Sequence, residues 1–122
     1  MNNIKLHARE ENGQKVADIC GVAIDLINRE TSNAQKISLA VLYIEPGKRS
    51  TPHYHLLTEE IYYFLEGEGR VIVDQNTFHV RPGSTVYIPL RKVHQVINDA
   101  TTPLKFLSAD SPVYDPADVL YP

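Results

Sequence analysis

Two histidines and two glutamates lie close together in the segment Thr51 to Glu60, which reads TPHYHLLTEE. Side chains two positions apart on a β-strand point to the same side, so His53 and His55 face together if this segment is extended. Glu60 would begin the next strand and add a carboxylate to the same face. Imidazole and carboxylate groups bind iron, manganese, nickel, copper and zinc, so this pattern indicates a transition-metal site. A surface hairpin with two exposed histidines is the alternative for these residues alone.

The segments around this cluster are short, apolar and separated by glycine, proline and asparagine. Short strands at this spacing predict an all-β sandwich or barrel. No segment has a sustained apolar period of about 3.6 residues, so we expect little helix. The predicted strand segments are 22–28, 37–45, 60–69, a hairpin over 70–80 with its turn at 74–76, 81–89, 94–99 and 104–109.

Composition limits the classes of partner. The 122 residues fit one domain, and the net charge of -3 argues against nucleic acid as a ligand. The apolar runs are too short to span a bilayer, and the N-terminal residues lack the apolar core of a signal peptide. The single cysteine, Cys20, excludes an internal disulfide, and we expect it to be a small buried residue. We therefore expect a cytoplasmic protein with no membrane partner.

The spacing of residues around the histidines resembles the two sequence motifs of the cupin family. The positions that match the first motif are Gly47, His53, His55, Glu60 and Gly67, and those that match the second are Gly83, Pro89, His94 and Asn98. The one departure is Arg91, which stands where the second motif has a glycine. The local turn at Arg91 is therefore open to two interpretations, a looser turn or an arginine that reaches the barrel mouth.

This resemblance implies a double-stranded β-helix, which is a small jelly-roll barrel. It also implies that His53, His55, Glu60 and His94 hold one divalent transition metal per chain, with iron, manganese, nickel, copper and zinc all open. We expect a single domain over residues 1–122, with a barrel core at about 20–110. The proline-rich residues 111–122 cannot form a central strand, and we expect an extended C-terminal arm.

Other polar residues lie near the motifs, and each has a functional and a structural interpretation. Glu59 alternates with Glu60 and is expected to be solvated, and His7 and His79 are expected on the surface. Tyr62 shares the face of Glu60, so its hydroxyl is either a catalytic group or the polar end of a packed ring. Arg49 and Arg91 are candidate substrate-binding residues that would attract an anion together with their lysine neighbours, and simple solvation is the alternative.

The resemblance implies an enzyme of the dioxygenase, decarboxylase or isomerase and lyase types acting on a small molecule. A non-catalytic binding or sensing barrel is the alternative, because fold does not fix function. A storage barrel fits less well, since it needs no open metal site. Ile61, Tyr63 and Leu65 point away from the expected core, so we also expect a homodimer that covers them.

Overall fold

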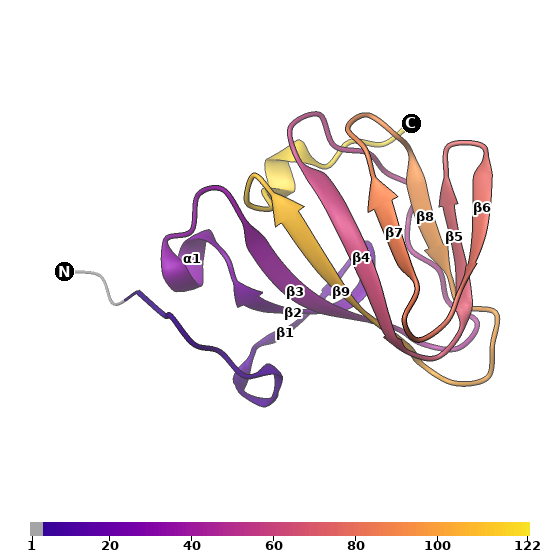
Figure 1. The fold of residues 1–122 in the computed structure, drawn as a ribbon, viewed down its shortest axis with the longest axis horizontal. Helices are drawn as coiled ribbons and strands as arrows, with labels where there is room; N and C mark the ends of the chain where they lie inside the picture. Colours follow the sequence, from indigo (N-terminus) through magenta and orange to yellow (C-terminus); the bar gives the residue numbers. More distant parts are fainter. Residues whose placement is uncertain (1–3) are drawn as a thin grey trace.

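The computed structural model describes residues 4–122, which form two antiparallel sheets that face each other (Figure 1). The six-stranded sheet has the order β1-β2-β3-β9-β4-β7, and the three-stranded sheet has the order β6-β5-β8. Strands of the larger sheet are β1 (Lys15–Asp18), β2 (Gly21–Ile27), β3 (Ser38–Ile44), β4 (Glu59–Glu66), β7 (Thr85–Ile88) and β9 (Leu104–Ser111). Those of the smaller sheet are β5 (Gly69–Val73), β6 (Asn76–Val80) and β8 (His94–Ile97).

Helix is nearly absent from residues 4–122, as the sequence predicted. The described residues contain one four-residue helix, α1 (Arg29–Ser32), and two single 3₁₀ turns, η1 (Glu10–Asn12) and η2 (Pro116–Asp118). None of these helices is long and apolar enough to cross a membrane. The all-β prediction is therefore confirmed.

Alternation along the central strands places the core between the two sheets. On β4, Glu60, Tyr62 and Phe64 point inward, whereas Ile61 and Tyr63 point outward. The inward rings of β4 meet Phe106 of β9, with ring centroids 4.9 Å from Tyr62 and 4.8 Å from Phe64. Burial of such rings contributes roughly 1.5–3 kcal/mol each. This aromatic layer fixes β4 and β9 beneath the polar end of the barrel.

Strand β1 lies outside the core range expected from the sequence. Its four residues are all exposed, so they carry no alternation of apolar and polar side chains. Backbone pairing with β2, from Lys15 opposite Ile24 to Asp18 opposite Gly21, holds the strand in place. Periodicity of apolar residues reveals which face of a strand is buried, but it does not reveal backbone pairing. An edge strand whose side chains are all exposed therefore cannot be detected from this periodicity.

The last residues, 112–122, form no strand of either sheet and are called here the C-terminal arm (Figure 1). The arm pairs with the segment between β3 and β4 through mutual backbone hydrogen bonds of Tyr54 and Leu120. The amide of Tyr114 donates to the Ser38 hydroxyl, and the side chain of Val113 is buried. The arm therefore lies against the polar end of the barrel.

Candidate metal centre

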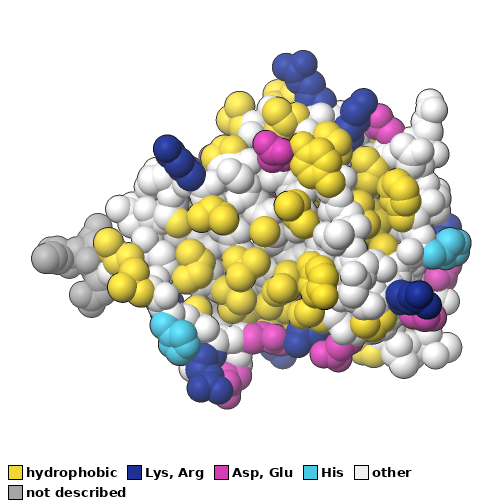
Figure 2. Space-filling model, viewed as in Figure 1, with side chains coloured by type: hydrophobic (Ala, Val, Ile, Leu, Met, Phe, Trp, Pro, Cys, Tyr) yellow, Lys and Arg dark blue, Asp and Glu magenta, His cyan; other side chains and the backbone are white. Residues whose placement is uncertain are grey.

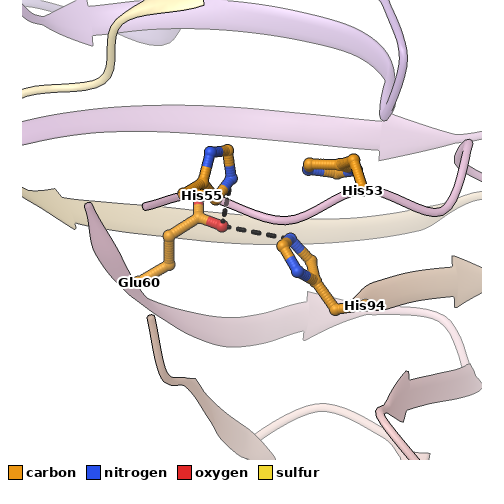
Figure 3. Close-up of side chains that lie close together, drawn as sticks. All are labelled: His53, His55, Glu60 and His94. Carbon is orange, nitrogen blue, oxygen red and sulfur yellow. Dashed lines mark ion pairs between the residues drawn. The ribbon is translucent and has the colours of Figure 1, made fainter. Parts of the chain in front are cut away.

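Four ligand-type side chains meet at the polar end of the barrel (Figure 3). His53 and His55 come from the segment before β4, Glu60 from β4, and His94 from β8 of the opposite sheet. One ligand atom from each residue lies within 4.8 Å of the others, and all four side chains are buried. The sequence motifs thus identified residues that the fold brings together.

Backbone pairing sets His53 beside His94, because the segment before β4 pairs with the edge strand β8. His53 and His94 form an isolated antiparallel bridge, with N-to-O distances of 3.2 Å and 2.9 Å. Next to it, the Ser50 hydroxyl accepts a hydrogen bond from the Val96 amide at 2.8 Å. The bridge therefore holds the backbone of His53 beside that of His94, which places the two imidazoles next to each other.

A backbone carbonyl fixes the ring of each histidine. The Nδ1 atoms of His53, His55 and His94 lie 2.8, 2.9 and 3.1 Å from the carbonyl oxygens of Thr51, Asp118 and Lys92. A carbonyl oxygen only accepts, so Nδ1 carries the hydrogen in each case. When neutral, each imidazole therefore presents its Nε2 lone pair, and this arrangement is the usual support of a metal-binding histidine.

Two of these Nε2 atoms have no hydrogen-bond partner in residues 4–122. The Nε2 atoms of His55 and His94 are buried and lie 3.1 Å and 3.2 Å from the same oxygen, Glu60 Oε1 (Figure 3). Two lone pairs directed at a carboxylate oxygen repel it unless a positive charge lies between them. A cation at this point would satisfy all three atoms, so the residues fit a metal ion of the imidazole- and carboxylate-binding type.

The electrostatics of the quartet also favour a positive charge. Burial, followed by the neighbouring His94, lowers the pKa of His53 to about 4, so this imidazole is neutral. Burial also opposes protonation of His55, but Glu60 outweighs it and raises the pKa of His55. Burial likewise disfavours ionised Glu60, yet the contacts with His55 and His94 hold the pKa of Glu60 well below its usual range. The carboxylate therefore stays charged and attracts a cation.

A second carboxyl group lies behind the first. The Ser108 hydroxyl lies 3.2 Å from Glu60 Oε2 and 2.8 Å from Asp110 Oδ1, and all three side chains are buried. Burial, followed by the charge of Glu60, raises the pKa of Asp110 to about 9, so this carboxyl is protonated at neutral pH. The β4–β9 register, which sets Glu60 opposite Asp110, creates this pair of carboxyl groups.

Tyr62 lies at the site as expected from its face of β4. Its hydroxyl is 3.5 Å from Glu60 Oε1 and its side chain is 1% exposed. Burial, followed by nearby carboxylates, raises the pKa of Tyr62 well above its usual range, so the phenol stays protonated. The tyrosine can donate a hydrogen bond at the ligand oxygen.

A small cavity of about 40 Å³ opens beside His53 and Glu60. Its lining also includes Cys20, which is buried as expected, and Tyr62. The remaining polar lining residues, which sequence reasoning did not single out, are Asp18, Asp25, Asn28, Ser38, Ser108, Asp110 and Tyr114. No lysine or arginine within residues 4–122 lines this cavity, so its wall is rich in hydrogen-bond-accepting oxygens.

The arginines proposed as anion-binding residues do not reach this cavity. Arg49 and Arg91 are both exposed, and neither belongs to the lining. Arg91 adopts the left-handed conformation with φ of 68°, and its amide donates to the His55 carbonyl at 2.7 Å. Arg91 therefore keeps the turn for which the motif uses glycine, and its backbone rather than its guanidinium acts on the site.

The remaining residues that the sequence singled out lie where it predicted. Glu59 is exposed and accepts a hydrogen bond from the Tyr87 hydroxyl at 2.7 Å, outside the site. His7 and His79 are exposed. Asn98, a motif position, is buried and donates to the carbonyl oxygens of Ile44 and Thr102, so it holds the loop between β8 and β9.

Comparison with known proteins agrees with this geometry. A family model described as "Cupin domain" matches residues 40–110, which is more than half of the chain and contains all four clustered residues. The chain belongs to the cupin family. Its likeness to a solved structure from Planctomyces limnophilus shows the same fold, with a TM-score of 0.80, 20% identity and coverage of 99% of this chain and 97% of that one.

Two known proteins are similar to this cupin in sequence, over different shares of their own length. An uncharacterised protein of Methanocaldococcus jannaschii is 36% identical over 94 residues, which cover 77% of this chain and 75% of the relative. The oxalate decarboxylase OxdC of Bacillus subtilis is 32% identical over 79 residues. That match covers 61% of this chain but 20% of the decarboxylase, so it relates one barrel to a part of a larger protein.

Proposed function

We propose that this cupin is a metal-dependent enzyme for a small molecule, with one divalent transition metal per chain held by His53, His55, Glu60 and His94. The observation that carries the proposal is the pair of buried Nε2 atoms that lack hydrogen-bond partners in residues 4–122 and are directed at one carboxylate oxygen. Such a metal supplies Lewis-acid chemistry, or redox chemistry if it is iron or manganese. Iron, manganese, cobalt, nickel, copper and zinc are all compatible with this ligand set.

The chain's own residues support a reaction that moves a proton. Asp110 holds a proton at neutral pH, and the Ser108 hydroxyl links it to Glu60 Oε2. Tyr62 presents a second protonated oxygen to Glu60 Oε1. General acid–base groups within hydrogen-bond reach of a substrate contribute typically 10²–10⁴-fold to rate. We therefore favour isomerase or lyase chemistry, with decarboxylation and dioxygenation as the other classes to test.

The cavity wall favours a neutral, hydroxyl-bearing substrate over an anion. Asp18 and Asp25 place carboxylates at the wall, and Ser38 and Tyr114 add hydroxyl groups. Carboxylates accept hydrogen bonds from substrate hydroxyls but repel a substrate carboxylate. Oxalate, the substrate named for the relative OxdC, is the natural anionic comparison. In the metal-free chain, binding of oxalate should be weaker than binding of a small polyol such as ethylene glycol or glycerol.

Adjacent glutamates provide a matched test of the metal site. Glu60→Gln removes the charge at the centre of the quartet, and Glu59→Gln makes the same change one position away on the exposed face. Calorimetric titration with Mn²⁺, Co²⁺ and Zn²⁺ should show one site per chain in the unchanged protein and in Glu59→Gln. Affinity should fall at least tenfold in Glu60→Gln. Equal affinities in the two variants would contradict the proposed ligand set.

Turnover separates an enzyme from a binding protein. The metal-loaded chain would be incubated with oxalate, small polyols and hydroxy-carbonyl compounds, and products would be followed by NMR. Product formation that Glu60→Gln lacks and Glu59→Gln retains would support the enzyme. Ligand binding at the metal without product from any of these compounds would favour the binding or sensing alternative.

We also propose that two copies of this cupin pair through the outer face of the six-stranded sheet. Ile61 and Tyr63 of β4, Tyr87 of β7 and Ile37 before β3 are about half exposed or more. Ile61, Tyr87 and Ile37 line one hollow of about 220 Å³ on this face. Figure 2 shows hydrophobic side chains spread across the molecule in this view. Apolar patches of this kind on a small domain are typical of interaction surfaces.

A further inference from the structure

The backbone amides between His55 and Glu60 donate hydrogen bonds to a side chain of the C-terminal arm. The Asp118 side chain is 7% exposed and accepts hydrogen bonds from three consecutive amides in that segment. Leu56 donates to Oδ1 at 3.0 Å, Leu57 to Oδ2 at 3.0 Å, and Thr58 to Oδ2 at 3.1 Å. These are the amides that immediately precede the strand carrying Glu60.

The same residue also contacts a proposed ligand through its backbone. The Asp118 carbonyl oxygen accepts from Nδ1 of His55 at 2.9 Å. Two residues further on, Leu120 pairs with Tyr54 in both directions at 2.9 Å and 3.0 Å. The C-terminal arm therefore contacts the ring nitrogen of His55 and the backbones of its two neighbours, Tyr54 and Leu56.

From these contacts we infer that Asp118 is a positioning residue for the metal site, so that docking of the C-terminal arm and metal binding stabilise each other. This inference rests on the proposed function. The Asp118 carboxylate holds the loop that separates His55 from Glu60, and its carbonyl selects the His55 tautomer whose Nε2 lone pair faces the metal. Coupling of this kind is reciprocal. The free energy by which the docked arm strengthens metal binding equals the free energy by which the bound metal strengthens docking of the arm.

The arm itself offers a matched control. Asp115 also lies on the arm, but its carboxylate accepts from the Ala117 amide at 2.9 Å and lies 3.9 Å from Arg29 Nη1. Asp115→Asn removes one negative charge and keeps a residue that caps a helical turn well. Asp118→Asn removes the same charge, but in either orientation its amide NH₂ would face a backbone N–H, that of Leu56 or those of Leu57 and Thr58. Only the second change disturbs the metal site.

The test is titration of the 122-residue chain with Co²⁺, followed through the visible d–d absorption of the bound ion. Asp118→Asn should raise the Co²⁺ dissociation constant 10–100-fold, the range typical of lost outer-shell support, and should change the band positions or intensities. Asp115→Asn should stay within about twofold with an unchanged spectrum. A merely structural role for Asp118 would lower thermal stability in chelator while leaving the spectrum of bound Co²⁺ unchanged.

The outcomes separate this inference from the metal proposal. If the unchanged chain binds Co²⁺ and both variants match it in affinity and spectrum, the role of Asp118 is overturned while the metal site stands. If the unchanged chain binds no Co²⁺, both are overturned.

If Asp118→Asn does not fold, amide hydrogen exchange on the unchanged chain tests whether arm docking and metal binding are coupled. Addition of Co²⁺ should slow exchange at Leu56, Leu57, Thr58 and Leu120 at least tenfold relative to the β5–β6 hairpin. Protection confined to the residues around His53, with Leu120 unchanged, would overturn the inference.

Discussion

Replacing Arg91 by glycine should stabilise this cupin, because Arg91 occupies a backbone conformation that suits glycine. Its φ is 68°, and a residue with a β-carbon in the left-handed region costs roughly 1–2 kcal/mol. Glycine loses more backbone entropy on folding, which offsets about 0.5–1 kcal/mol of that gain. The net increase in the free energy of unfolding should be about 0.5–1 kcal/mol, which is a rise in Tm of roughly 2–4 °C for a chain of this size.

Thermal and urea unfolding of Arg91→Gly in the presence of chelator would measure this gain without a contribution from metal. Arg91→Ala is the control, since it removes the exposed guanidinium and keeps the β-carbon. It should change stability by less than about 0.5 kcal/mol. If Arg91→Ala gained as much as Arg91→Gly, the side chain and not the backbone would be responsible, and the argument from φ would be refuted.

Three further predictions follow from the site and the outer face. Burial and Glu60 raise the pKa of Asp110 to about 9, so the folded chain holds a proton that the unfolded chain releases above pH 4. In chelator, stability should therefore fall by up to about 1.4 kcal/mol per pH unit as pH rises toward 9, and urea unfolding of Asp110→Asn should lack this loss. Tyr62→Phe should leave metal content unchanged and lower turnover at least tenfold, whereas unchanged turnover would remove the hydroxyl from the reaction. Light scattering should give a dimer for the unchanged chain and a monomer for Ile61→Glu, and a monomer in both cases would contradict the proposed interface.

The four clustered residues, His53, His55, Glu60 and His94, could be predicted from the sequence because most of the signal lies in one short segment. His53, His55 and Glu60 lie within one short segment, and strand alternation decides which of them share a face. His94 required the second motif, since spacing within its own strand does not show that β8 returns to the same end of the barrel. The buried core strands could also be predicted from local signals, because each is a run of apolar residues bounded by turn residues.

The supporting residues could not be predicted, because they reach the site through pairing between distant segments. Ser108 and Asp110 are brought to Glu60 by the β4–β9 register, and the predicted strand ended one residue short of Asp110. A serine and an aspartate two apart at the end of an apolar strand were the available signal. Asp118 lies in a proline-rich tail that carries no periodicity, so its partners depend wholly on the path of the arm.

The position of the two arginines relative to the cavity could not be predicted for a related reason, and the anionic substrate stays a prediction. Arg49 and Arg91 are close to the motifs in sequence, but loops at a barrel rim can turn their side chains to solvent. The residues that do line the cavity include Asp25 of β2, Ser38 of β3 and Asp110 of β9, which lie far apart in the sequence. Proximity along the chain is a poor guide to charge inside a barrel whose wall is built from distant strands.

The most direct test of the metal site is elemental analysis of protein purified without chelator or histidine tag. His94→Ala removes a buried member of the quartet, and His79→Ala removes an exposed histidine on β6 as the matched control. The account predicts about one transition metal per chain in the unchanged protein and in His79→Ala, and less than about a tenth of that in His94→Ala. Equal metal content in the two variants, or no metal in the unchanged chain even after reconstitution, would contradict it.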